Sequence, residues 1–135
     1  PGQKTRSDIY APTHAVDVFP TLMKLVGKPL PAWGEGQPLP GLGGVEDYER
    51  GTFTVEAKRN SSLRPLQKAT IALRKGTYKL IYYTGYEAQD SFELYNLESD
   101  IEEINDLYPA RPAIAKTMRE QLLDSLSDAN KPYMK

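Results

Sequence analysis

The chain has 135 residues and a formal net charge of −1, with 17 basic and 18 acidic side chains. This length suits one domain with a modest core, and the balanced charge gives no indication of a nucleic-acid partner. The absence of cysteine excludes disulfides, thiolate metal sites and a cysteine nucleophile within these residues, and the single histidine leaves little capacity for acid–base chemistry near neutral pH.

The ends of the sequence give no targeting information. No apolar run approaches the roughly 20 residues that span a bilayer, so we expect no membrane span. No signal peptide is visible. The chain begins at Pro1 without an initiator methionine, so we expect the natural N-terminus to lie elsewhere, and the missing signal indicates no compartment.

Residues 17–27 predict a short helix. Asp17 stands where a side-chain oxygen can accept from the free N–H groups of the first turn, and Pro20 falls where a missing N–H costs little. Helical spacing places four large apolar side chains on one stripe: Phe19, Leu22, Met23 and Val26. Gly27 ends the helix.

Residues 28–51 are rich in proline and contain six of the ten glycines. Such a segment predicts an irregular linker, and its length exceeds that of a simple connection inside a compact domain. We therefore place a boundary between two structural units here.

The remainder predicts an α+β unit. Four runs rich in β-branched and aromatic residues predict the strands of an antiparallel sheet: 52–57, 69–74, 77–83 and 91–95. Lys75-Gly76 suits a two-residue hairpin turn. Residues 110–129 predict a helix that covers one face of the sheet with a stripe that recurs every fourth residue: Ile114, Met118, Leu122 and Leu126.

Several polar groups admit a functional and a structural interpretation. His14 has no second histidine at ligand spacing, so a ligand or base role is the weaker interpretation. Asp100, Glu102 and Glu103 are close enough to suggest a divalent-cation site, but they lack the spacing of a calcium loop, and a solvated acidic turn is favoured.

Two further clusters are basic or aromatic. Residues 58–67 form a basic loop, containing Lys58, Arg59 and Arg64, which is either simply solvated or contacts an anion. Five tyrosines are interleaved with Lys75 and Lys79 along the predicted sheet: Tyr78, Tyr82, Tyr83, Tyr86 and Tyr95. They would suit base or sugar stacking, but core packing with edge exposure accounts for them, and no excess of basic charge supports nucleic-acid binding.

Five phrases occur in a characteristic order. They are THAVDVFPTLMKLVG at 13–27, GQPL at 36–39, RKGTYKLI at 74–81, ELYNLE at 93–98, and an acidic turn with Asp100, Glu103 and Asn105-Asp106-Leu107. Together they resemble the C-terminal end of a sulfatase of the alkaline phosphatase superfamily, over residues 13–126. Pro38, Asn96 and Ile101 depart from the family pattern, which usually has Ser, Asp and Pro there; none is at a catalytic position.

The resemblance implies a division of the chain. Residues 1–27 would be the end of the catalytic domain, 28–51 the linker, and 52–135 the small C-terminal subdomain. The family's chemistry belongs to a preceding domain, with a formylglycine made from Cys or Ser and a calcium ion. The resemblance therefore implies no catalytic, cofactor-binding or metal-binding residue in this chain, which we expect to be inactive alone and to support the catalytic domain or line its substrate cleft.

Partners follow from the same resemblance. They are the chain's own N-terminal catalytic domain and a sulfated small molecule or glycan as substrate of a periplasmic or secreted parent. The exposed N-terminal helix also suggests self-association. Two alternatives remain: the C-terminal part of a related phosphodiesterase or phosphonate hydrolase, and a self-standing interaction module without enzymatic activity.

Overall fold

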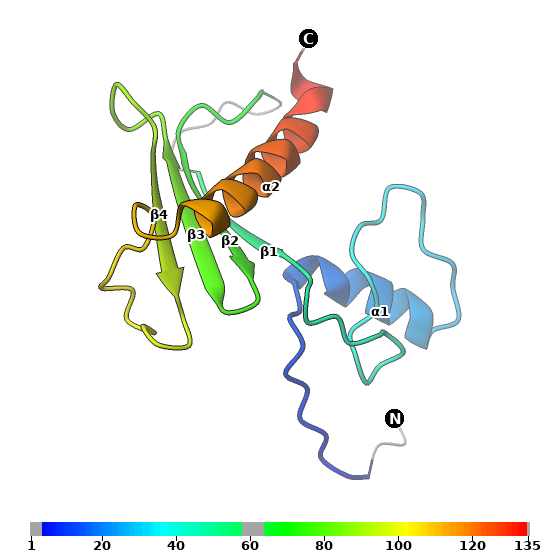
Figure 1. Cartoon of the computed structure of the whole chain (residues 1–135). Helices are drawn as coiled ribbons and strands as arrows, with labels where there is room; N and C mark the ends of the chain where they lie inside the picture. Colours follow the sequence, from blue (N-terminus) through cyan, green and yellow to red (C-terminus); the bar gives the residue numbers. More distant parts are fainter. Residues whose placement is uncertain (1–3, 58–63, 135) are drawn as a thin grey trace. The chain divides into compact units, whose positions relative to one another are not determined.

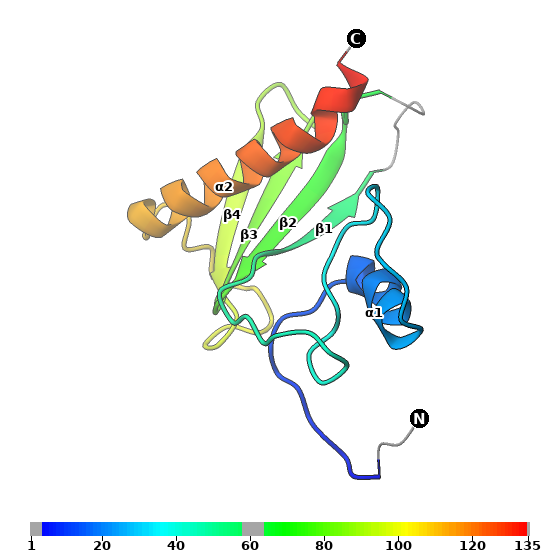
Figure 2. The same cartoon turned by 90° about the vertical axis from the view of Figure 1, so that its right-hand side faces the viewer.

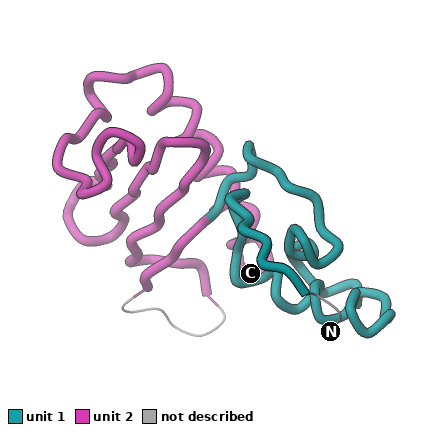
Figure 3. Tube along the Cα trace, turned by 90° about the horizontal axis from the view of Figure 1, so that it is seen from below, with its two compact units in different colours: residues 1–52 teal, residues 53–135 magenta. Residues whose placement is uncertain are grey.

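The computed structural model of the chain describes residues 4–57 and 64–134. It separates into two units, residues 1–52 and residues 53–135, which Figure 3 colours teal and magenta. The first unit contains a 3₁₀ turn, η1 (Ala15–Asp17), followed by helix α1 (Val18–Leu25). From Thr52 onward come β1 (Thr52–Glu56), β2 (Ala69–Lys75), β3 (Tyr78–Thr84), β4 (Ser91–Asn96), α2 (Pro112–Asn130) and η2 (Lys131–Tyr133). The predicted linker, residues 28–51, lies within the first unit.

The four strands form one sheet in the order β1-β2-β3-β4, so each strand lies beside its neighbour in sequence. The β2–β3 and β3–β4 pairs are antiparallel, with Leu73 opposite Leu80 and Leu80 opposite Leu94. This arrangement confirms the predicted α+β fold with a four-stranded antiparallel sheet, and each strand end differs from its predicted position by one residue or none.

The hairpin turn between β2 and β3 lies one residue later than predicted. Lys75 and Tyr78 are paired, so the two loop residues are Gly76 and Thr77 rather than Lys75 and Gly76. Gly76 has a φ of +56°. A positive φ at the first loop residue is the requirement of a type II′ hairpin, and it places glycine there rather than at the second position.

Helix α2 lies across one face of the sheet (Figures 1 and 2). It begins two residues later than predicted, at Pro112, and ends one residue later, at Asn130. Met118 and Leu122 of the predicted stripe are buried against the sheet, whereas Ile114 and Leu126 are partly buried at its margin. The largest fully buried side chains of this core are leucines from three strands and the helix: Leu73, Leu80, Leu94 and Leu122. The predicted packing of the helix on the sheet is confirmed.

Helix α1 is shorter than predicted and is stabilised differently. It ends at Leu25, and Gly27 adopts a φ of +67° while the Lys28 N–H bonds the Met23 carbonyl oxygen at 2.9 Å. The glycine therefore terminates the helix as expected. The predicted capping role of Asp17 is wrong: its side chain makes no cap hydrogen bond to α1. Instead its oxygens accept from groups outside the first turn, as described below.

No helix in the described part of the chain is long and apolar enough to cross a membrane.

Candidate functional site

The acidic turn after β4 does not bring its carboxylates together. Asp100 accepts from the N–H groups of Ile104 and Asn105, at 3.1 and 2.8 Å, and these bonds lower the pKa of its carboxyl group. Both carboxylate oxygens of Glu103 lie 2.7 Å from the Lys79 ammonium, and Glu102 is exposed. Within residues 4–57 and 64–134, no group of three potential ligands could hold a metal ion.

The Lys79–Glu103 pair connects two of the five sequence phrases. Lys79 belongs to RKGTYKLI on β3, and Glu103 belongs to the acidic turn. Glu103 has a φ of +58°, a left-handed conformation that costs a non-glycine residue about 1–2 kcal/mol. The ion pair and the turn hydrogen bonds around Asp100 hold that conformation, so the spacing of these phrases has a structural reason.

The five tyrosines do not form one surface. Tyr82 is buried in the core beneath α2, and Tyr78 packs against that core. Tyr83 lies on β3 and Tyr95 lies on β4. Both hydroxyls donate to the Glu93 carboxylate, at 2.8 and 3.1 Å. Burial, together with the Glu93 charge, raises the pKa of each of these two hydroxyls to about 12. Tyr86 lies under the Lys68 ammonium instead. The contacts of these tyrosines are those of core packing and of hydrogen bonds and ring contacts on the sheet surface.

The remaining sequence candidates have local contacts. The His14 side chain accepts from the Val16 N–H and so caps the 3₁₀ turn. Of the predicted basic loop, Lys58 and Arg59 lie outside the described residues, and Arg64 is exposed.

The most tightly bonded polar group in the first unit is Asp17. Its side chain is 1% exposed, and its two oxygens lie 2.6 and 2.8 Å from the two terminal nitrogens of Arg50. The same oxygens accept from the N–H groups of His14 and Gln37. The hydrogen bonds from Arg50 affect the pKa of the Asp17 carboxyl group more than any other contact does. With the backbone hydrogen bonds they lower this pKa to about 2, although burial of the carboxylate raises it. This bidentate, charge-assisted contact joins the C-terminal end of the 28–51 segment to the residue before α1, and the Gln37 N–H joins the middle of the segment to the same carboxylate.

Thr21 and Lys24 add two further ties between α1 and the same segment. The Thr21 hydroxyl donates to the Asp17 carbonyl oxygen at 2.6 Å and accepts from the Leu39 N–H at 2.8 Å. The Lys24 ammonium donates to the Gly43 carbonyl oxygen at 2.5 Å. The predicted linker therefore packs on α1 through polar groups.

As a result, α1 has its apolar side chains on the solvent side. Asp17, Pro20 and Thr21 are buried. Four apolar side chains that share one helical face are more than half exposed: Val18 at 52%, Leu22 at 54%, Leu25 at 53% and Val26 at 65%. We refer to these four residues as the α1 apolar face. A helix of a soluble domain normally buries such a stripe, and this one leaves it exposed in the chain.

The predicted stripe is only partly this face. Leu22 and Val26 belong to it, whereas Phe19 and Met23 are half-buried, and the Phe19 ring stacks on Trp33 at 5.2 Å. Sequence reasoning missed Arg50, because it lies 33 residues from Asp17 in a segment without periodicity. A lone arginine at the end of a glycine-rich segment was the only available signal.

Neither a protein-family model nor a curated protein matches the chain. Solved structures do. A protein from Bacteroides thetaiotaomicron assigned as a sulfatase is 28% identical over 86% of this chain, with a TM-score of 0.62. The phosphonate monoester hydrolase of Agrobacterium radiobacter is 21% identical over 90% of the chain, with a TM-score of 0.69. BT4656, solved with its substrate D-glucosamine-2-N,6-O-disulfate, is 23% identical over 87%, with a TM-score of 0.56.

The match occupies only part of each of these proteins. The chain spans 24–26% of their length, about a quarter. The structural matches agree with the five ordered phrases and with the antiparallel sheet covered by one helix. The chain is therefore similar in fold to a segment, about a quarter, of sulfatases and of a phosphonate monoester hydrolase.

Proposed function

We propose that this chain is the C-terminal part of an enzyme that hydrolyses sulfate esters, and that its own role is to bind and stabilise the catalytic domain. The α1 apolar face carries this proposal. Four large apolar side chains remain more than half exposed on one helix, and covering them stabilises a complex by roughly 25 cal/mol per Å² of apolar area. In the proposed parent the catalytic domain covers them.

The chain itself does not fit the family's reactive groups. A formylglycine requires a Cys or Ser followed by Pro or Ala and then Arg at fixed steps, and the chain has no cysteine and no serine in that setting. A calcium ion requires several convergent carboxyl oxygens. Those of Asp100 and Glu103 are committed to the turn N–H groups and to Lys79. Both groups belong, on this proposal, to the catalytic domain.

A phosphonate monoester hydrolase is the second candidate for the parent. The Agrobacterium enzyme matches 90% of the chain with a TM-score of 0.69, against 0.62 for the Bacteroides protein. The segment thus fits both reaction classes, and the five phrases resemble an ending that both classes share.

The test combines this chain with the polypeptide encoded immediately upstream, expressed separately. We expect the two to form a complex, and the amides of α1 to gain protection from hydrogen exchange. Hydrolysis of an aryl sulfate should appear in the complex and should be absent from the 135-residue chain alone. Preferential hydrolysis of an aryl phosphonate would identify the second candidate instead.

A pair of variants separates the α1 apolar face from general surface effects. Leu22→Lys places a charge in the proposed interface and should abolish the complex. Ile104→Lys makes the same change at an apolar side chain that is 70% exposed in the acidic turn, and should leave the complex unchanged. A complex insensitive to Leu22→Lys would contradict the proposal. A reading frame that begins near Pro1 would favour a self-standing interaction module.

A further inference from the structure

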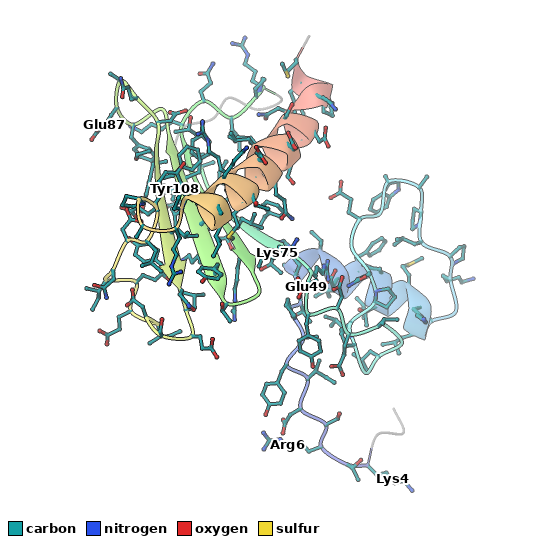
Figure 4. All side chains as sticks on the ribbon, in the orientation of Figure 1. Lys4, Arg6, Glu49, Lys75, Glu87 and Tyr108 are labelled. Carbon is teal, nitrogen blue, oxygen red and sulfur yellow. The ribbon has the colours of Figure 1, made fainter. Side chains whose placement is uncertain are left out.

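A surface groove of about 720 Å³ lies beside the N-terminal half of α2 and the turn that enters it. Its walls combine flat apolar side chains, Tyr108, Pro109 and Pro112, with the charged side chains of Lys116, Arg119 and Glu120. All of these residues belong to the second unit. Figure 4 labels Tyr108 beside the first turns of α2. Its floor shares Tyr108, Ala115 and Leu123 with the core packing, and the proposed contact through α1 does not use it.

The groove is built on a stack of aromatic rings. Tyr82, Phe92 and Tyr108 follow one another with centroid distances of 4.5 and 5.5 Å and nearly parallel planes. The Arg119 guanidinium lies 5.0 Å from the centre of the Phe92 ring. Because Tyr82 is buried in the core, this stack orients Tyr108 and Arg119 without a ligand. Such preorganised groups lose little conformational entropy on binding.

The charges of the groove favour an anion. Two cations face one carboxylate, and the Lys116–Glu120 contact is long, 3.9 Å, with both side chains more than 60% exposed. Within residues 4–57 and 64–134, Arg119 makes no salt bridge, so its donors remain available in addition to the contact with Phe92. A guanidinium fork suits a planar or tetrahedral oxyanion through paired N–H bonds.

We infer that this groove binds a sulfated oligosaccharide. Sugar rings present apolar C–H faces that pack on tyrosine and proline, while their sulfate groups accept from Arg119 and Lys116. The inference rests on the proposed function and deepens it, because it adds a site for the substrate chain outside the catalytic domain. BT4656, which matches 87% of this chain, was solved with a disulfated glucosamine.

The experiment titrates the ¹⁵N-labelled 135-residue chain with a heparin hexasaccharide at low salt and records amide chemical shifts. We expect shifts at Tyr108, Lys116 and Arg119. Arg119→Gln should raise the Kd about fivefold, the size of one partly solvated ion pair. The matched control is Arg74→Gln, which removes the same charge at an exposed residue that does not line the groove and should change the Kd less than twofold.

Three probes define the ligand class. An unsulfated hexasaccharide of the same backbone should shift the same amides only weakly, and inorganic sulfate should not displace the hexasaccharide at equal sulfate concentration. Equal binding of sulfated and unsulfated sugars would overturn the inference, as would shifts outside the groove or an equal loss in Arg74→Gln. Tighter binding of a single-stranded oligonucleotide would overturn it in favour of a nucleic-acid site.

Failure of this inference is distinguishable from failure of the proposed function. Aryl-sulfate hydrolysis by the two-chain complex uses a small substrate that does not need the groove. Hydrolysis without hexasaccharide binding would overturn the groove site alone. Hexasaccharide binding at the groove without hydrolysis would support the site and contradict the proposed function.

Discussion

The two units of the chain distribute polar and apolar side chains in opposite ways. The second unit buries leucines between its sheet and α2, with Leu80 and Leu122 fully inaccessible. The first unit buries the Asp17 carboxylate and the Thr21 hydroxyl, and it exposes the α1 apolar face. The same chain therefore contains one unit organised around a hydrophobic core and one organised around hydrogen bonds.

This difference shows which unit has a hydrophobic core of its own. Apolar burial stabilises a unit in proportion to the area removed from water, and the second unit has its own closed core. A buried ion pair contributes little net stability, because desolvation of its charges offsets their attraction. The first unit thus has a defined local geometry but little apolar burial of its own, and the proposed function attributes this to a contact with the catalytic domain.

The largest expected effect compares two leucines on the two helices. Leu122 of α2 is 0% exposed and Leu22 of α1 is 54% exposed. Leu122→Ala should lower the free energy of unfolding of the second unit by about 2–5 kcal/mol, because it leaves a cavity in the core. Leu22→Ala should change the stability of the isolated chain by no more than about 0.5 kcal/mol.

Urea unfolding with two signals separates the units. Trp33 is the chain's single tryptophan and lies in the first unit, stacked on Phe19, so its fluorescence reports that unit. Far-ultraviolet circular dichroism is dominated by the sheet and α2. A loss above about 2 kcal/mol for Leu22→Ala would show that the α1 apolar face is covered in the isolated chain.

The next effect concerns the Asp17–Arg50 pair. Arg50→Met keeps an unbranched apolar stem but removes the guanidinium, and it leaves the Asp17 carboxylate buried with only the His14 and Gln37 N–H groups as donors. Removing one partner of a buried pair costs about 3 kcal/mol. The Trp33 transition should move to lower urea, while the circular dichroism transition of the second unit stays in place. A joint shift of both transitions would show that the two units unfold together.

A smaller effect follows from pH. The pKa of Asp17 is lowered in the folded chain from 3.8 to about 2, so its contribution is fully present above about pH 5 and is lost as pH falls toward 2. The shift corresponds to about 2 kcal/mol. The Trp33 transition should lose this amount between about pH 5 and pH 2, and Arg50→Met should lose clearly less. An equal slope in wild type and Arg50→Met would attribute the pH effect to other carboxylates.

Sequence patterns predicted the second unit well because its structure is local and periodic. Alternation located the four strands, and the four-residue spacing of Met118 and Leu122 identified the face of α2 that packs on them. The misplaced hairpin turn differs by one residue, because the Lys75-Gly76 pair does not specify which loop position glycine occupies. Hydrophobic periodicity and residue propensity thus predict where helices and strands occur, whereas the register of the hairpin depends on the backbone conformation of its turn.

The first unit was predicted less well because its contacts join residues without a pattern. The position of Asp17 predicts a helix cap, but its side chain binds Arg50, which lies 33 residues later in an irregular segment. No periodicity connects these two residues. The predicted apolar stripe was only partly right, because Leu22 and Val26 lie on the exposed face whereas Phe19 and Met23 are half-buried. Which side of the helix is exposed depends on the polar contacts of the opposite side, such as that between Thr21 and Leu39. Sites built from such long-range polar contacts require the tertiary structure.

The smallest expected effect tests a tie within the second unit, the Lys79–Glu103 pair. Its two side chains are 26% and 28% exposed, so the pair contributes about 1 kcal/mol at most. Glu103→Gln removes the charge, keeps the φ of +58°, and should lower the free energy of unfolding by about that amount. Glu103→Gly loses the same ion pair, but glycine adopts the left-handed conformation without the cost of about 1–2 kcal/mol that glutamate incurs.

The glycine variant should therefore equal or slightly exceed the wild type in stability, and the glutamine variant should be the less stable of the two. Circular dichroism during urea unfolding of the second unit measures both differences, and high salt should reduce the wild-type advantage over Glu103→Gln because it screens the ion pair. If Glu103→Gly is less stable than Glu103→Gln, the backbone at this position carries no strain. The ion pair and the turn hydrogen bonds from Ile104 and Asn105 to Asp100 would then be the whole reason for the spacing between the β3 phrase and the acidic turn.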